Sequence, residues 1–260
     1  MIIQKMQSTF SNPVIYHADW LCENSLNSLI GKSLSIKFLG NFFCQVCQKK
    51  SKKLFGEAFC YSCFVSSAQA SPCILKPELC LAHIGVGRDL DWEEKNHNQP
   101  HVVYLAATDT VKVGVTRKTQ IPTRWIDQGA SSVIIFAETS NRYEAGIIEV
   151  ALKEFYTDKT NYKKMLQNEI DLNIDLVEEK WSTIDNLPSD LSQFVSENDE
   201  IVAFNYPVLN YPSSIQTFSL EKQNQFSGIL QGIKGQYLIF DNNIVFNVRK
   251  HSGYEVQIEY

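Results

Sequence analysis

The sequence lacks any run of about 18 apolar residues, the length that a membrane-spanning helix needs. Its N-terminal segment also lacks the continuous apolar stretch and the small-residue cleavage site of a secretory signal peptide. We therefore expect no membrane segment and a cytoplasmic location. Disulfides are disfavoured in that compartment, so the cysteines are expected to be free thiols or metal ligands.

The chain also lacks an overall excess of positive charge, because its formal net charge is −5 at pH 7. The charge is unevenly distributed: it is +1 over residues 1–40, +3 over residues 41–165 and −9 over residues 166–260. A polyanion such as DNA or RNA would therefore bind the middle part, whereas the acidic last part disfavours contact with a phosphate backbone.

The middle part contains strand-like and helix-like patterns in turn. Two apolar runs joined by "TDT" predict a hairpin, and a helical apolar stripe follows Ser140 or Asn141, either of which can cap the helix. The predicted strands are Lys32–Gly40, His101–Ala107, Val111–Thr116 and Ser131–Thr139, and the predicted helices are Pro122–Gln128 and Ser140–Tyr156.

The second half of the chain divides into two regions. Residues 167–200 are acidic and irregular, which predicts a solvated helix or linker. Residues 201–260 contain short alternating runs separated by turns such as "DNN" and "HSG", which predict a β-rich module, either a small barrel or a sandwich. The strand within residues 1–40 is expected to join the sheet of that module.

Four cysteines have the spacing Cys44-x2-Cys47-x12-Cys60-x2-Cys63. Each Cys-x-x-Cys turn directs two thiolates at one point, so two such turns predict a tetrahedral Zn²⁺ site. Because four sulfurs leave no open coordination position, this zinc is expected to be structural. The alternatives are four buried free thiols or a redox pair.

A second, looser group of metal-binding residue types lies in the rest of the segment 41–100. The spacing Cys80-x2-His83 is typical of metal ligands. The ligands predicted for a second zinc are Cys73, Cys80, His83 and His97. The alternative is that these histidines are structural. Cys22 stands apart and is expected to be a thiol in the core.

Basic residues flank the cysteine pairs and the hairpin. Four lysines lie in "QKKSKKLFG", between the two cysteine pairs, and two more basic residues follow the second strand of the hairpin. Such residues either contact nucleic-acid phosphates or form a solvated surface. The residues predicted to bind nucleic acid are Lys49, Lys50, Lys52, Lys53, Arg117 and Lys118.

The hairpin and the helices after it resemble the GIY-YIG nuclease superfamily. The resemblance lies in "VVYLA", "VKVGVT" and "RW", whose order matches the two strand motifs and the helix arginine of that family. Its members cut DNA, or occasionally RNA, with one divalent metal. The chain departs from the pattern because His-Val or Val-Val replaces Gly-Ile, and lysine replaces the tyrosine of the second motif. The resemblance assigns catalytic positions to Tyr104, Lys112, Arg124, Glu149 and Asn161.

Phosphodiester cleavage would give these residues distinct roles. Tyr104 would act as the base or orient the attacking water, Glu149 would hold Mg²⁺ or Mn²⁺, and Arg124 would clamp the phosphate. Lys112 would add positive charge, as would the arginine that ends the hairpin. Asn161 would fix a ligand or a loop.

Each of these residues also has a structural interpretation. Tyr104 could be a core aromatic, Glu149 could pair with Lys153, Arg124 could stack on the tryptophan beside it, and Asn161 could cap a helix. The functional interpretation therefore depends on whether the side chains converge on one concave surface.

Phrases along nearly the whole chain are similar to an uncharacterised bacterial family, domain of unknown function 2797. These phrases are "FCYSCF", "KPELC", "KVGVTRKTQIPTRWIDQGA", "DKTNYKKML" and "GIKGQYLIFD". Together the patterns predict an α+β fold in which a zinc-ribbon segment (41–100) precedes a small GIY-YIG-like α/β domain (101–166). The acidic region and the β-rich barrel or sandwich module follow.

The function predicted from the sequence is that of a zinc-containing nucleic-acid-binding protein with a GIY-YIG-like domain. That domain would be a Mg²⁺- or Mn²⁺-dependent endonuclease. Two alternatives stay open: a catalytically silent RNA-binding protein that recognises shape, and a zinc-stabilised protein-interaction scaffold.

Overall fold

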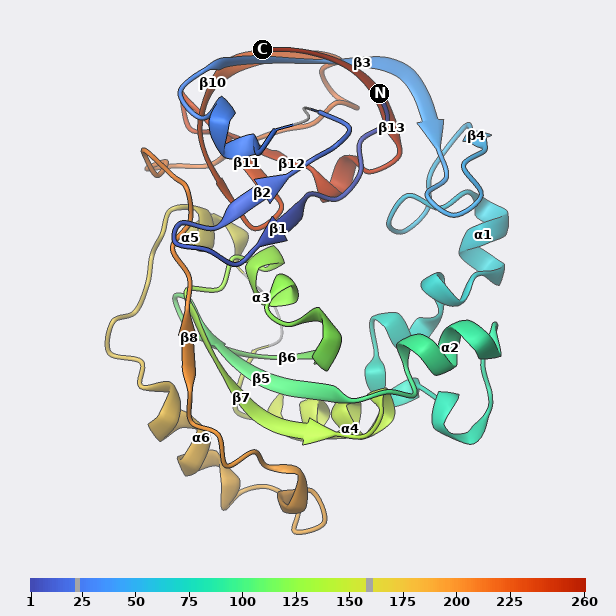
Figure 1. Ribbon diagram of the computed structural model, residues 1–260, viewed down its shortest axis with the longest axis vertical. Helices are drawn as coiled ribbons and strands as arrows, with labels where there is room; N and C mark the ends of the chain where they lie inside the picture. The colour runs from blue at the N-terminus through green and yellow to red at the C-terminus, as the bar shows by residue number, and fades with distance from the viewer. Residues whose placement is uncertain (22–23, 158–160) are drawn as a thin grey trace.

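The computed structural model describes residues 1–21, 24–157 and 161–260, so Cys22 lies outside the described residues. These residues form a mixed α+β structure with three β-sheets (Figure 1). A four-stranded sheet lies at the lower end of this view, a larger sheet lies at the upper end, and a two-stranded sheet lies between them. Within the described residues, no helix is long and apolar enough to cross a membrane.

The four-stranded sheet is antiparallel and has the order β6-β5-β7-β8. Its strands are β5 (His101–Ala107), β6 (Val111–Arg117), β7 (Ser132–Thr139) and β8 (Ile201–Ala203). Tyr104 of β5 lies opposite Gly114 of β6 and Ile135 of β7. Every residue of β5 is buried, because the strand has a neighbour on each edge. The predicted hairpin is confirmed.

Helices cover both faces of this sheet. Alternate β5 side chains point to opposite faces, so each face presents its own apolar residues to a helix. The helices are α3 (Thr123–Asp127), α4 (Arg142–Leu152) and α6 (Leu176–Ile184). Tyr104 packs with Trp125 of α3 on one face, and Leu105 packs with Ile148 of α4 on the other. Asn141, one of the two predicted caps, accepts a hydrogen bond from the backbone of the first turn of α4.

The larger sheet has the order β13-β3-β10-β11-β12-β9, with β4 paired to β3. Its strands are β3 (Ser33–Phe43), β4 (Lys50–Ser51), β9 (Gln216–Phe218), β10 (Gln225–Lys234), β11 (Tyr237–Phe240), β12 (Ile244–Asn247) and β13 (Tyr254–Glu259). The predicted strand Lys32–Gly40 overlaps β3, which pairs with the C-terminal strands, as expected.

The predicted barrel is wrong, because the larger sheet does not close. The first half of β10 pairs with β3 and its second half pairs with β11, with a register shift between Leu230 and Gly232 that bends the strand. Within the described residues, no pairing joins β9 to β13. The sheet curls around a core that includes Ile36, Leu230 and Phe246.

The acidic region 167–200 is packed against the four-stranded sheet rather than solvated. Leu176, Leu187 and Leu191 are buried with residues of β5 and β7. The ammonium of Lys180 is also buried, and its Nζ lies 2.9 Å from a carboxylate oxygen of Asp199. A further difference is that β8, expected in the C-terminal module, pairs instead with β7.

The segment 41–100 connects the two large sheets along the right side of Figure 1. Its helices are α1 (Tyr61–Ser66) and α2 (Leu90–Asn96), and short 3-10 turns lie between them. The remaining elements are β1 (Gln7–Thr9), β2 (Ile15–His17) and α5 (Tyr162–Leu166). The hairpin β1–β2 lies between the larger sheet and α3 (Figure 1).

Candidate metal centres and a cationic cavity

The four cysteines of the Cys-x-x-Cys pairs meet at one point, as the spacing predicts. The sulfur atoms of Cys44, Cys47, Cys60 and Cys63 all lie within 4.8 Å of one another, and we call this group the ribbon cluster. The first pair follows β3, and the second pair begins at the N-terminal end of α1. A backbone bond between Cys44 and Lys49 closes the first turn, and one from Gln45 to Ala58 links it to the segment before the second pair.

The backbone beside Cys44 favours its thiolate, whereas hydrogen bonds with the neighbouring thiols, chiefly Cys60, raise the pKa of Cys63 to about 12. Burial raises the pKa of the Cys44 thiol, but backbone hydrogen bonds from Cys60, Cys47 and Val46 outweigh this effect and lower the pKa to about 6. Thiolates are the form that binds a metal. Four mutually close sulfurs with backbone donors around them fit a structural Zn²⁺, which takes four-coordinate sulfur sites of this kind.

A second group of metal-binding side chains is present, and all of its members are buried. It comprises Cys73, Cys80, Glu93 and His97, whose ligand atoms lie within 4.8 Å of one another, and we call it the buried cluster. The Cys73 sulfur lies 3.8 Å from Nδ1 of His97, and the same ring nitrogen contacts a carboxylate oxygen of Glu93. A hydrogen bond from the Cys73 thiol lowers the pKa of Cys80 to about 4.

The structure brings together three of the four ligands predicted for a second zinc, with Glu93 in place of His83. The His83 ring instead stacks on Tyr143, with ring centroids 4.6 Å apart. Glu93 and His97 are four residues apart on α2 and therefore share one face of the helix. That spacing is the signal in the sequence that could have identified Glu93.

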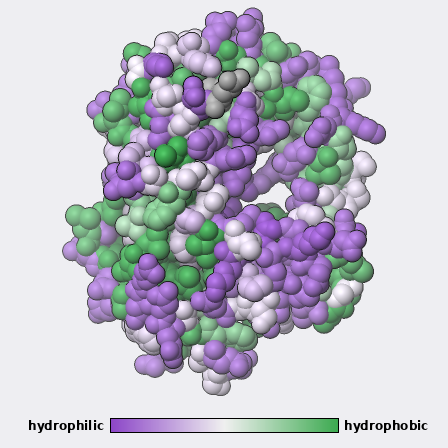
Figure 2. All heavy atoms as spheres, viewed as in Figure 1, coloured by the Kyte–Doolittle hydropathy of each residue, from purple (hydrophilic) through white to green (hydrophobic). Residues whose placement is uncertain are grey.

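A cavity of about 680 Å³ lies between the segment 41–100, β6 and α4. Figure 2 shows this face hollowed near its centre, with mostly hydrophilic residues around the hollow. The charged side chains that line the cavity are Lys5, Glu57, Arg117, Arg124, Arg142, Glu149, Lys153 and Arg249. Because six of these eight are basic, we call it the cationic cavity. A second cavity, of about 800 Å³, adjoins it and shares Lys5 and Gln45.

Three residues with predicted catalytic roles meet at this cavity. Arg124 of α3 and Glu149 of α4 approach it from opposite faces of the sheet, around the edge strand β6. Tyr104 lies just beneath the lining, because a Cβ added to Gly114 would come within 2.6 Å of its hydroxyl. That hydroxyl donates a hydrogen bond to Oε1 of Gln128, 2.6 Å away.

The environment of Tyr104 favours a neutral phenol. Burial raises its pKa to about 12, although the positive charge of Arg124 lowers it, and the negative charge of Glu149 adds to the rise. A group with such a pKa is protonated near pH 7, so Tyr104 suits the role of a hydrogen-bond donor better than that of a base.

The positive charges of the cavity are only partly neutralised. Glu149 lies 3.3 Å from the ammonium of Lys153, and Glu57 lies 2.6 Å from Arg249. Among the described residues, no carboxylate is within ion-pair distance of the three arginines on β6, α3 and α4. These arginines are Arg117, Arg124 and Arg142. Their guanidinium groups therefore make the cavity attractive to an anion.

Lys112 and Asn161 do not join this group. The Lys112 ammonium is buried and donates to Oγ1 of Thr108 at 2.6 Å, and it lies 3.6 Å from Asp109 in the hairpin turn. Oδ1 of Asn161 accepts hydrogen bonds from the backbone of α5, at Lys163 and the residue after it. Both residues therefore have structural partners, and within the described part of the chain neither lines the cationic cavity.

Of the residues predicted to bind nucleic acid, only Arg117 lines the cavity in the described structure. It contacts the side-chain oxygen of Asn96 at the end of α2. Lys118 is exposed and forms an ion pair with Glu138 of β7. The lysines between the cysteine pairs are exposed at the tip of the ribbon, where Lys53 lies 5.3 Å from the centre of the Phe55 ring.

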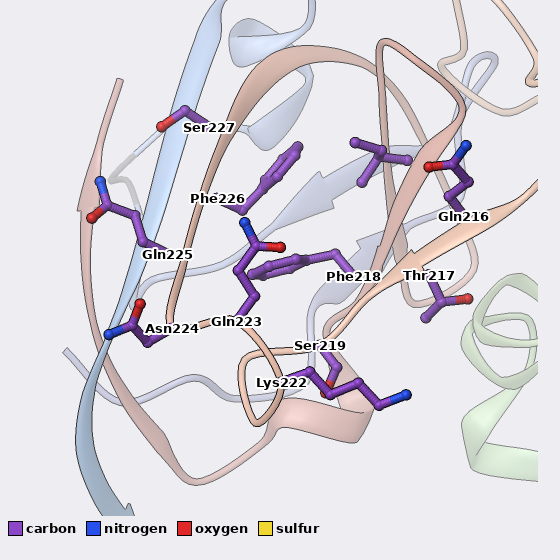
Figure 3. Close-up of a pocket in the computed structure, with 11 residues that line it drawn as sticks. Gln216, Thr217, Phe218, Ser219, Lys222, Gln223, Asn224, Gln225, Phe226 and Ser227 are labelled. Atoms are coloured by element: carbon purple, nitrogen blue, oxygen red, sulfur yellow. The ribbon is translucent and has the colours of Figure 1, made fainter.

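A third concave surface, of about 790 Å³, lies at the open side of the larger sheet (Figure 3). It lies between β9 and the first half of β10, where amide side chains surround the rings of Phe218 and Phe226. Lys222 is the only charged residue among those that line it. A phosphate backbone would find little charge complementarity on this surface, which agrees with the acidity of this part of the chain.

The family of the chain follows from a comparison with known families. The family described as "Protein of unknown function (DUF2797)" matches residues 31–256. The chain belongs to this family. The match spans the ribbon cluster, the buried cluster and the lining of the cationic cavity apart from Lys5, and it confirms the family predicted from the sequence. No curated protein and no solved structure matches this DUF2797 chain.

Proposed function

We propose that this protein binds nucleic acid by its phosphates in the cationic cavity, at a site of GIY-YIG type. The observation that carries the proposal is the convergence of Arg124 and Glu149, from helices on opposite faces of one sheet, above the hydroxyl of Tyr104. These residues lie far apart in the sequence, and the resemblance names all three.

The charge and size of the cavity support a phosphate-containing ligand. Guanidinium groups bind phosphate oxygens in pairs of hydrogen bonds. Arg117 and Arg124 line the cavity with no described carboxylate within ion-pair distance, whereas the guanidinium of Arg142 donates to backbone carbonyls at its edge. A volume of about 680 Å³ lies within the range of about 300–1,000 Å³ for small-ligand pockets. It therefore suits one or a few nucleotides of a single strand or an end, rather than the body of a duplex.

Binding is better supported than cleavage. The tyrosine of the second motif is replaced by Lys112, whose ammonium is engaged by Thr108 and Asp109 away from the cavity. The position of Asn161 at a helix cap removes a second member of the predicted catalytic set. Of the predicted catalytic set, Tyr104, Arg124 and Glu149 are left at a mainly basic surface.

Metal-dependent cleavage is the second candidate function, and Glu149 is the observation that favours it. Mg²⁺ is commonly bound by one or two carboxylates together with the phosphates of the substrate, so a single glutamate beside three arginines is an adequate protein contribution. Glu149 would hold Mg²⁺ or Mn²⁺, which would activate water and stabilise the leaving oxygen. Arg124 would stabilise the charge on the phosphate.

Binding is tested with the full chain and fluorescent single-stranded RNA and DNA of random sequence, by anisotropy at several salt concentrations. We expect affinity to fall as salt rises, because bound phosphates release counterions. Arg124→Ala should weaken binding about tenfold and reduce the slope of log affinity against log salt by about one.

The matched control is Lys222→Ala, which removes one positive charge from the amide-lined surface instead. It should bind as the unaltered protein does. Equal affinity of Arg124→Ala and the unaltered protein would contradict the proposal. Absence of any salt-dependent binding would favour the protein-interaction scaffold.

Cleavage is tested by incubating the same oligonucleotides with the full chain and Mg²⁺ or Mn²⁺. A nuclease would produce fragments that Glu149→Gln abolishes while binding persists, because this variant keeps the side-chain shape but weakens the metal ligand. Binding without fragments in either metal identifies the protein as a silent binder.

A further inference from the structure

The buried cluster has the composition and geometry of a complete metal site. Two thiols, a carboxylate and an imidazole place one ligand atom each within 4.8 Å of the others, and all four side chains are buried. Sulfur, nitrogen and oxygen ligands of this kind bind Zn²⁺ in tetrahedral geometry. Because the protein supplies four ligands and the site is buried, the metal would have a structural role.

Burial of Glu93 calls for a positive charge beside it, from either a protonated His97 or a bound cation. Glu93 is 3% exposed and lies among two thiols, with the His97 ring as its hydrogen-bonding neighbour. A buried carboxylate is strongly disfavoured unless it is paired or coordinates a metal. A Zn²⁺ held by two thiolates, one carboxylate and a neutral imidazole leaves one net negative charge at the site.

Arg142 is placed to compensate that remaining charge. Its Nε and Nη2 donate to the carbonyl of Cys73 at 3.0 and 2.9 Å, and Nη2 also donates to the carbonyl of Ile74 at 2.9 Å. The backbone N–H of Arg142 donates to the carbonyl of His97. One arginine therefore ties together the segments that supply the sulfur and nitrogen ligands.

The position of the Glu93 side chain depends on residue 87 being a glycine. A Cβ added at this glycine would lie 2.6 Å from Cγ of Glu93 and 3.1 Å from its Oε1. Real Cβ atoms do not approach other atoms so closely, so any larger residue would displace the glutamate. The loop before α2 thus leaves room for Glu93 to reach the cysteines.

We propose that Cys73, Cys80, Glu93 and His97 bind a second structural Zn²⁺, with Glu93 rather than His83 as the fourth ligand. The site is separate from the ribbon cluster and does not depend on what the cationic cavity binds.

The test is the zinc content of the full chain, measured by elemental analysis after reconstitution with Zn²⁺ and removal of unbound metal. The unaltered protein should contain two zinc ions per chain. Glu93→Gln should contain one, since an amide is a much weaker zinc ligand than a carboxylate. His83→Gln is the matched control and should retain two.

Reconstitution with Co²⁺ provides a second measurement that needs no altered residue. Two cobalt ions bound in different ligand sets should give two binding phases with different sulfur-to-cobalt absorption intensities, the stronger from four thiolates and the weaker from two. A single zinc and a single cobalt phase in the unaltered protein would overturn the proposal. So would two zinc ions in Glu93→Gln together with one in His83→Gln.

Discussion

The ribbon cluster and the buried cluster differ in burial, in ligand type and in the way the chain supplies their ligands. The ribbon cluster consists of four cysteines from two tight turns, and three of the four are partly exposed. The buried cluster draws two cysteines from 3-10 turns and two further residues from α2, and Arg142 of α4 holds it from outside. The first cluster is a local motif at the molecular surface, and the second is part of the tertiary structure.

This difference predicts different consequences when each cluster is broken. The ribbon cluster holds together a small segment whose lysines are exposed, although Leu54 packs against the core of the larger sheet. The buried cluster lies between α2 and α4, close to the four-stranded sheet, so its loss should propagate into the main core.

The largest expected effect is on global stability. Cys80→Ser should lower the free energy of unfolding by about 3–5 kcal/mol, because it leaves buried charges of the cluster uncompensated. For a chain of this size that corresponds to a decrease in Tm of roughly 10 °C. Thermal unfolding followed by circular dichroism in the presence of Zn²⁺ would measure it.

The matched variant is Cys60→Ser, which breaks the ribbon cluster. We expect a smaller change in the main transition and rapid proteolysis confined to residues 44–66. If Cys60→Ser destabilises the core more than Cys80→Ser, the distinction between a peripheral and an integral cluster is wrong.

The second prediction concerns the loop that leaves room for Glu93. Gly87→Ala should displace the carboxylate and weaken zinc binding at the buried cluster about 10- to 100-fold, comparable to the loss of a residue that orients a ligand. Competition with a chromogenic chelator measures this affinity. Val86→Ala is the control, since that side chain is half exposed, and it should leave both zinc ions in place.

The sequence predicted those parts of the fold that local patterns determine. The hairpin β5–β6, strand β7 and helix α4 are marked by alternation, by an apolar stripe and by the cap at Asn141. The ribbon cluster was predictable for the same reason, because each Cys-x-x-Cys turn is complete within four residues. The strand-like run at residues 201–206 was expected, but its place at the edge of β7 was not, because the pattern of a three-residue strand does not say which sheet it joins.

The functional residues could be predicted only in part, because the sequence does not fix where a long side chain points. Lys112 and Arg124 belong to the same predicted catalytic set, yet the Lys112 ammonium bonds within the hairpin turn while Arg124 lines the cavity. Glu93 was missed because glutamate on a surface-like helix is usually solvated, and only the packing of α2 buries it. His83 had suitable spacing from Cys80, but its ring is occupied by stacking on Tyr143.

A third prediction separates charge from positioning at the point where the buried cluster meets the cationic cavity. Arg142→Lys keeps one positive charge but cannot make the three hydrogen bonds to the carbonyls of Cys73 and Ile74. We expect zinc to leave the buried cluster about tenfold faster in a chelator. This factor corresponds to about 1.4 kcal/mol and agrees with the loss of charge-assisted hydrogen bonds.

Arg124→Lys is the companion variant, because Arg124 lines the same cavity without contacting the cluster. It should release zinc at the unaltered rate. Equal acceleration in both variants would mean that the hydrogen bonds of Arg142 to the carbonyls of Cys73 and Ile74 are not what retains the metal.

The smallest expected effect concerns the lysines of the ribbon tip. Lys52→Ala should change the affinity for single-stranded RNA or DNA less than twofold, because this side chain is exposed and lies outside the residues that line the cavity. Four thiolates around Zn²⁺ carry a net charge of −2, and the nearby lysines can offset that charge without touching a ligand. Anisotropy should be measured in low salt, where surface electrostatics are strongest and any effect of Lys52→Ala would be largest. A fall as large as that of Arg124→Ala would mean that bound nucleic acid extends from the cavity across the ribbon, and the peripheral cluster would then share in binding.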